Sequence, residues 1–105
     1  MSNNLSKLWV DDLRPPPDDT WRWVTTSSEA IQWLQDACIG TISLDHDLGG
    51  DDTTRPIVLH MCMEEIWPKI IYIHSCNVVG IDWLAKMCVR YSPDTTVVEI
   101  RGEWR

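Results

Sequence analysis

The feature that most constrains this chain is the alternation of short apolar runs with longer segments of helical periodicity. The predicted strands are 8–10, 21–25, 41–44, 70–73 and 97–100, and the predicted helices are 26–40, 55–67 and 81–91. Strands joined by helical crossovers form parallel sheets, because a parallel neighbour cannot be reached by a tight turn. The sequence therefore predicts an α/β fold with a five-stranded parallel sheet and helices on both faces.

Local signals define the ends of two segments. Pro15–Pro17 exclude a helix between the first two strands, so we expect an extended loop over 13–19 in place of a crossover helix. Thr26 and Glu29 have the spacing of a capping box that begins the helix over 26–40. Gly40 is typical of a residue that ends such a helix.

Length and charge limit the class of protein. A chain of 105 residues and 12.2 kDa can build one core, so we expect a single domain over 1–105 with a short tail over 102–105. Neither a signal-peptide core nor an apolar run near the ~20 residues of a membrane span occurs, which predicts a cytoplasmic protein without a membrane partner. The net charge of −7 argues against a broad nucleic-acid surface, but permits one anionic group held by a metal or an arginine.

Three polar clusters follow directly after predicted strands. They are the segments 11–14, 45–47 and 74–77, and they contain acids, an arginine, histidines and a hydroxyl. The carboxyl ends of parallel strands meet at one edge of a sheet, where ligands of open α/β sheets bind. We therefore expect the three clusters to form one site.

The acids of these clusters predict a cation site. Asp11, Asp12 and Asp45 are the expected metal ligands, with Asp47 close by. Carboxylates brought together raise one another's pKa values or recruit a cation, and hard oxygen ligands suit Mg²⁺ or Mn²⁺. The alternative is that these aspartates cap helices and fill turns. In a mechanism that uses histidines alone, Asp11 and Asp12 would only orient other groups.

Two histidines are candidates for proton transfer. His46 lies between two aspartates that favour its charged form, which suits a general acid, and His74 is then the candidate base. Asp47 joins them as a predicted catalytic residue. The alternative for each histidine is a structural, hydrogen-bonded role, which is also what we expect for His60 in the middle of a helix.

A further set of residues suits a phosphate. The fork of Arg14 matches phosphate oxygens, although the alternative is a surface ion pair with one of the neighbouring acids. Ser75 and Asn77 can hydrogen-bond a phosphate, and Asn77 can cap the following helix. The backbone N–H groups up to Gly80 would then form an anion cradle.

These motifs resemble two related groups of proteins. Strands that end in Asp11-Asp12, in Asp45 and in Ser75 resemble the phosphorylation site of response-regulator receiver domains, where the acids bind Mg²⁺ and the central aspartate accepts phosphate. The chain departs from that pattern because the first helix is missing. It also lacks the lysine expected after the fifth strand, where Arg101 is the nearest cation.

A narrower group fits better. The segments 9–17, 43–49 and 74–80 closely resemble the cyclic-phosphate-processing receiver-like domains, small bacterial and phage proteins that lack the first receiver helix. The resemblance covers about residues 8–100 and implies a flavodoxin-like, three-layer domain that processes cyclic phosphates. It implies the same site residues, namely Asp11, Asp12, Arg14, Asp45, His46, Asp47, His74, Ser75 and Asn77. Val78 and Thr53–Arg55 depart from the family pattern.

The sequence thus favours a phosphoesterase that opens or removes a cyclic phosphate on a nucleotide messenger or an RNA terminus. Two alternatives stay open. One is a module that sequesters a cyclic nucleotide without cleaving it, for example in phage counter-defence. The other is a phosphoacceptor receiver in which Asp45 takes up phosphate.

Overall fold

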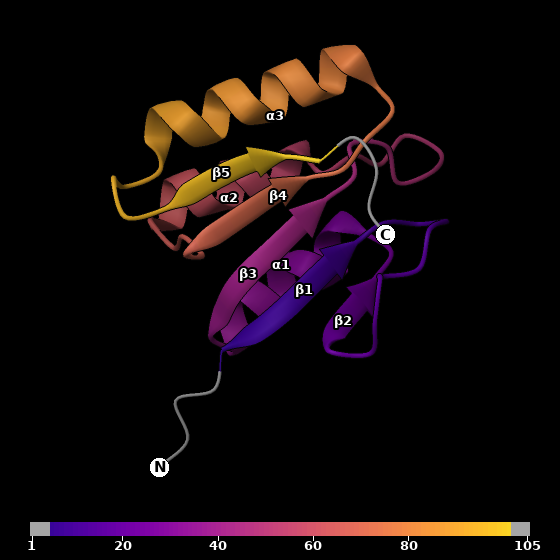
Figure 1. The fold of residues 1–105 in the computed structure, drawn as a ribbon, viewed down its shortest axis with the longest axis horizontal. Helices are drawn as coiled ribbons and strands as arrows, with labels where there is room; N and C mark the ends of the chain where they lie inside the picture. The colour runs from indigo at the N-terminus through magenta and orange to yellow at the C-terminus, as the bar shows by residue number, and fades with distance from the viewer. Residues whose placement is uncertain (1–4, 102–105) are drawn as a thin grey trace.

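The computed structural model describes residues 5–101 and contains a five-stranded parallel sheet with the strand order β2-β1-β3-β4-β5 (Figure 1). Its elements are β1 (Ser6–Val10), β2 (Trp21–Val24), α1 (Ser27–Asp36), β3 (Ile39–Leu44), α2 (Arg55–Glu64), β4 (Ile70–Ile73), α3 (Val78–Tyr91) and β5 (Val97–Ile100). The predicted receiver-like α/β fold is confirmed, including the loop between β1 and β2 in place of a helix. The predicted tail over 102–105 lies outside the described residues.

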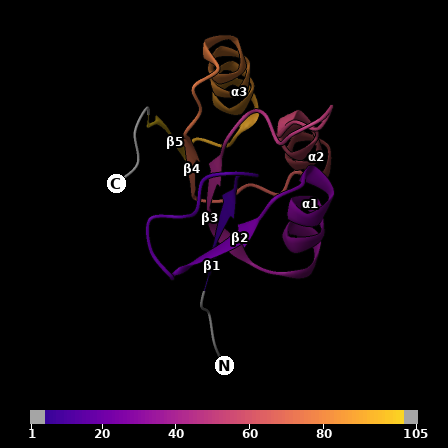
Figure 2. The same ribbon diagram turned by 90° about the vertical axis from the view of Figure 1, so that its right-hand side faces the viewer.

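One face of the sheet carries the hydrophobic core. Alternate strand residues such as Leu8, Ile42 and Ile71 are fully buried there, together with Ala30 of α1, Met61 of α2 and Leu84 of α3. All three helices therefore pack on this face, as Figure 2 shows. The expectation that helices cover both faces of the sheet is therefore wrong.

The strand order gives the physical reason. The crossovers that contain α1, α2 and α3 all advance in the same direction across the sheet, from β2 towards β5. Right-handed crossovers that advance in one direction place their helices on the same face. Only the connection from β1 to β2 runs the other way, and this is the connection in which prolines exclude a helix.

Aromatic side chains and this loop form the layer on the opposite face. Trp9 and Trp21 meet edge to face with ring centroids 5.5 Å apart, and Trp21 lies 6.4 Å from Tyr72. The Trp9 indole N–H donates to the backbone oxygen of Arg14 at 2.8 Å, which ties the loop to β1. The loop thus starts in a fixed position at the carboxyl edge of the sheet.

Three helix boundaries differ from those expected, and one of them is the end of α2, which lies at Glu64 and not at 67. Thr26 caps α1 as predicted, with its hydroxyl accepting from Glu29 N at 3.2 Å, but the helix ends at Asp36. Gly40 lies in β3, where a Cβ would come within 2.6 Å of the Leu5 Cβ, so it serves close strand packing instead of a helix end. The last helix begins at Val78, earlier than expected, because the Asn77 side chain caps it.

The described helices are short. The longest of them, α3, has 14 residues. Within residues 5–101, no helix has the length and apolar character needed to cross a membrane. The cytoplasmic location stays a prediction.

Candidate functional site

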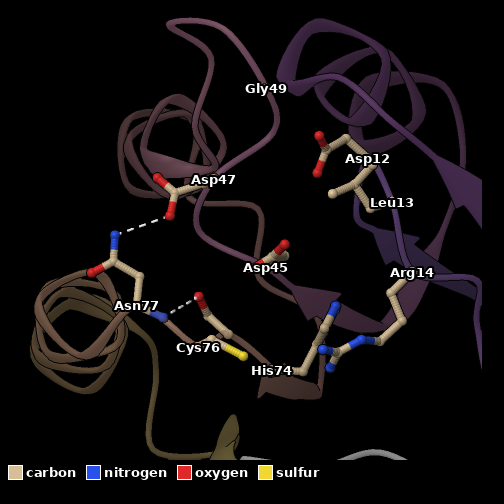
Figure 3. A pocket seen from close by; sticks show the side chains of 10 residues that line it. Asp12, Leu13, Arg14, Asp45, Asp47, Gly49, His74, Cys76 and Asn77 are labelled. Atoms are coloured by element: carbon tan, nitrogen blue, oxygen red, sulfur yellow. Dashed lines mark hydrogen bonds between the residues drawn. The ribbon is translucent and has the colours of Figure 1, made fainter.

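A pocket of about 350 Å³ opens at the carboxyl edge of the sheet, where β1, β3 and β4 end (Figure 3). Each strand continues into a loop that turns polar side chains towards this space. The lining residues are Asp12, Leu13, Arg14, Asp45, Asp47, Gly49, His74, Ser75, Cys76 and Asn77. The three predicted polar clusters therefore meet at one site.

Three carboxylates form the acidic part of the site. Asp11, Asp12 and Asp45 each offer a ligand oxygen, and these oxygens lie within 4.8 Å of one another. Gly49 lies against them in a left-handed conformation (φ +88°), and a Cβ there would come 3.0 Å from Asp12 Oδ2. Three hard oxygen donors this close together fit a cation such as Mg²⁺ or Mn²⁺.

Asp11 is buried and accepts three hydrogen bonds. Its Oδ1 accepts from the backbone N–H groups of Leu13 at 2.9 Å and Arg14 at 2.8 Å, and its Oδ2 lies 3.0 Å from His74 Nε2. Burial raises the pKa of Asp11, but the hydrogen bonds from His74 and from the two backbone groups outweigh it and lower the pKa below its usual 3.8. Asp11 is therefore ionised and held in one orientation.

In Asp45, the effects that raise the pKa outweigh those that lower it. Burial and the nearby charge of Asp11 raise its pKa above 3.8, against the hydrogen bonds from Ser75 and from the backbone of His46 that lower it. A carboxylate destabilised in this way gains most when a cation neutralises its surroundings. The electrostatics of Asp45 thus agree with the fit of the three carboxylates to a cation.

His74 lies beneath the pocket and is only 1% exposed. Its Nε2 contacts Asp11, and its Nδ1 lies 2.6 Å from the hydroxyl of Ser43 on β3. The ring is stacked on Trp9, with centroids 3.9 Å apart and planes 12° apart. Both ring nitrogens therefore have partners inside the protein, and the ring orients Asp11.

His46 does not line the pocket but contacts its wall. Its Nδ1 lies 3.0 Å from Asp47 Oδ1, and its Nε2 accepts from the Arg55 Nε–H at 2.9 Å. The ring lies so close to α3 that a Cβ on Gly80 would come within 2.3 Å of its Cγ. Glycine at position 80 is needed for this approach of the helix to the imidazole.

Asp47 and Asn77 form the pocket wall nearest α3, and Figure 3 shows their hydrogen bond. The Asn77 amide donates to Asp47 Oδ2 at 3.0 Å, while its oxygen accepts from Gly80 N at 2.9 Å. The bonds from Asn77 and His46 lower the pKa of Asp47. Ser75 lies behind them and accepts from Asn77 N at 3.1 Å. The Gly80 N–H is used by the helix cap and does not face a ligand.

Arg14 faces the pocket from the loop after β1. Its backbone N–H donates to Asp11 Oδ1, and its backbone oxygen accepts from the Trp9 indole N–H. Among the contacts of residues 5–101, no ion pair joins its guanidinium to Asp11 or Asp12, contrary to the alternative of a surface ion pair. The guanidinium is therefore available to an anion in the pocket.

Most of the predicted site residues line the pocket, while Asp11, His46 and Gly80 lie behind it. Sequence reasoning missed two residues that hold the histidines, Ser43 and Arg55. A polar Ser43 inside a buried apolar strand was the available signal. Arg55 gave none, because its contact with His46 depends on the path of the intervening loop.

Comparisons with known proteins identify the family of this chain. No curated protein and no solved structure matches the chain. Residues 6–90 match the family model described as the cyclic-phosphate processing receiver domain. This match covers more than half of the sequence and every residue of the pocket. The chain belongs to the family of cyclic-phosphate processing receiver domains.

Proposed function

We propose that this protein is a phosphoesterase that hydrolyses a cyclic phosphate on a nucleotide or an RNA terminus. The observation that carries the proposal is that the acidic cluster and the Arg14 guanidinium, which has no ion-pair partner among residues 5–101, meet at one pocket. A cation and a guanidinium facing the same small space can bind one phosphate group, despite the net charge of −7. A pocket of about 350 Å³ suits a small ligand or a chain end better than a duplex.

The phosphate would lie between two walls of the pocket. Arg14 and Asn77 come from opposite sides in Figure 3, so that one phosphate can contact both. Mg²⁺ or Mn²⁺ held by Asp11, Asp12 and Asp45 would supply positive charge for the phosphoryl oxygens. Ser75 keeps Asp45 and Asn77 in place through its hydroxyl.

We infer that a carboxylate, and not a histidine, accepts the proton of the attacking water. Each histidine uses both ring nitrogens inside the protein, so direct transfer from either ring would first break a hydrogen bond. Asp47 is ionised, and its side chain is 61% exposed. We therefore assign to Asp47 the proton of the attacking water, while His46 and His74 orient carboxylates. The ribose oxygen that leaves takes its proton from solvent.

The test is turnover of defined substrates. The protein is incubated with 2′,3′-cyclic mononucleotides, cyclic dinucleotides and an RNA that ends in a 2′,3′-cyclic phosphate, with Mg²⁺, Mn²⁺ or EDTA. We expect a linear phosphomonoester from at least one of them, detected by ³¹P NMR and mass spectrometry. Asp47→Asn should lose turnover and retain binding, whereas Arg14→Ala should raise KM. Absence of turnover on the whole panel overturns the proposal.

One observation favours a second function. The site has no histidine ring nitrogen free for catalysis within the described residues, which agrees with a module that binds a cyclic nucleotide and does not cleave it. Such a protein would bind one ligand per chain and release it intact after denaturation. Uptake of a phosphoryl group on Asp45 from a small phosphodonor, seen as an increase in mass, would instead indicate a phosphoacceptor receiver.

A further inference from the structure

Arg55 makes a contact that gives it a role in the site although it does not line the pocket. It is the first residue of α2, and its Nε–H donates to Nε2 of the His46 ring at 2.9 Å. We infer that Arg55 is a positioning residue, which orients the His46 ring with its proton on Nδ1 so that the ring donates to Asp47 in the pocket.

The two shortest contacts of the His46 ring allow one arrangement of protons, since the Asn77 amide nitrogen lies farther from Nδ1, at 3.5 Å, and donates to Asp47 at 3.0 Å. An ionised Asp47 only accepts hydrogen bonds, so the Nδ1 that lies 3.0 Å from its Oδ1 must carry the proton. The Arg55 guanidinium only donates, so Nε2 must offer its lone pair. The two partners together therefore favour the Nδ1–H tautomer.

Arg55 is itself held in place on two sides. Its guanidinium carbon lies 4.6 Å from the centre of the Trp83 ring on α3. Its backbone N–H donates to the hydroxyl of Thr53 at 3.2 Å. Stacking on an indole suits the planar guanidinium and fixes its direction more firmly than it would fix a lysine ammonium.

The contact between Arg55 and His46 also affects Asp47, the carboxylate to which we assign the proton of the attacking water. Asp47 receives one hydrogen bond from His46 on Oδ1 and one from Asn77 on Oδ2, so both of its oxygens are oriented. Without Arg55, Asp47 alone would favour the proton on Nδ1, and no donor would keep a proton off Nε2. In the Nε2–H tautomer, Nδ1 would turn a lone pair towards the Asp47 carboxylate, and the carboxylate would lose its orientation.

The experiment reads the tautomer directly by ¹H–¹⁵N NMR of the histidine rings, assigned with single His→Gln variants. In the unmodified protein we expect a protonated Nδ1 and an unprotonated Nε2 for His46. Arg55→Met, which removes the guanidinium and keeps an apolar stem as far as the ε position, should raise the share of His46 rings that carry a proton on Nε2. Arg55→Lys, which retains a donor, should keep the Nδ1–H form.

The matched control is Arg22→Met. Arg22 lies over Trp33 at 4.7 Å as Arg55 does over Trp83 at 4.6 Å, but the side-chain hydrogen bonds of His46 among the described residues do not involve Arg22. This variant should give the His46 spectrum of the unmodified protein. An Nε2–H signal for His46 in the unmodified protein overturns the inference without any variant. An unchanged tautomer in Arg55→Met also overturns it.

An activity arm rests on the proposed function. With a substrate that is turned over, Arg55→Met should lower kcat about tenfold with little change in KM, because binding groups in the pocket remain. Arg55→Lys should recover most of this loss. If no substrate is hydrolysed, the proposed function is wrong. The NMR measurement of the His46 ring protons still tests the role of Arg55 in that case.

Discussion

Nε2 of His74 lies 3.0 Å from Oδ2 of Asp11, and this contact joins the end of β4 to the end of β1 across the intervening strand. The intervening strand β3 provides the partner of the other ring nitrogen, the hydroxyl of Ser43 at 2.6 Å. One buried imidazole thus links three neighbouring strands at the edge where the pocket opens. Its loss should affect both the fold and the acidic cluster.

We predict that His74→Ala destabilises the protein by about 3 kcal/mol. The substitution leaves a cavity against Trp9 and removes a partner from the buried Asp11 and Ser43. Urea unfolding monitored by tryptophan fluorescence measures the change. His60→Ala is the control, since the Nε2 of His60 has no hydrogen-bond partner among the described residues, and it should cost less than about 1 kcal/mol. Equal losses in both variants would contradict the structural role of His74.

Asp45→Asn should stabilise the protein at neutral pH in the presence of EDTA, by about 1 kcal/mol. Burial and the charge of Asp11 raise the pKa of Asp45 in the fold, so its ionisation costs stability. The cost is absent below the unfolded pKa of about 3.9, appears as the pH rises, and is complete above the folded pKa. The gain measured by urea unfolding should therefore vanish in acid.

The control for this prediction has the opposite sign. Hydrogen bonds from Asn77 and His46 lower the pKa of Asp47, so its ionised form stabilises the fold above the unfolded pKa, and this contribution is lost as the pH falls. Asp47→Asn should therefore lose stability at neutral pH and approach the unmodified protein in acid. A gain in stability for Asp47→Asn, or a loss for Asp45→Asn, would contradict the electrostatic account.

A divalent cation should raise the thermal unfolding temperature of the protein. At a concentration 100 times its dissociation constant, a ligand of the folded state adds about 2.7 kcal/mol. Asp12→Asn removes one carboxylate of the cluster and should abolish most of the Mg²⁺ or Mn²⁺ effect. Asp51→Asn alters an exposed acid of the nearby loop that lies outside the cluster, and it should keep the effect. An equal response of both variants would indicate non-specific binding.

Gly80→Ala should destabilise the protein by about 2 kcal/mol, although alanine is the better helix former by about 1 kcal/mol. The added Cβ would come 2.3 Å from Cγ of His46, so the ring or the helix must move. Gly50→Ala is the control, since its Cβ would meet nothing within 4 Å and only its φ of +57° adds strain, of about 1 kcal/mol. Unfolding curves should rank the two variants in this order, and the reverse order would contradict the packing of His46 against α3.

Much of the site could be predicted from the sequence because its residues follow directly after strands. In a parallel sheet the carboxyl ends of neighbouring strands share one edge, so Asp11, Asp45 and Ser75 had to lie near one another once the strands were recognised. The role of Asn77 as a helix cap is equally local, because its partner is the backbone of a residue three positions later. These features depend on short-range spacing.

The roles of the histidines could not be predicted in this way. His46 lies between two aspartates in the sequence, yet one ring nitrogen contacts Arg55, nine residues away beyond a loop whose path the sequence does not reveal. His74 pairs with residues 31 and 63 positions away. Such partners depend on strand register, in which a shift by one residue turns every side chain to the other face.

The sequence by itself determined the succession of strands and helices along the chain, the loop that replaces the first crossover, and the edge of the sheet at which the polar residues lie. Only the tertiary structure decided that α1, α2 and α3 share one face, that His74 stacks on Trp9, and that Arg55 contacts His46. The physical reason is the range of the interactions. Periodicity, proline and capping act within a few residues, whereas strand order and side-chain partners arise from contacts between distant segments.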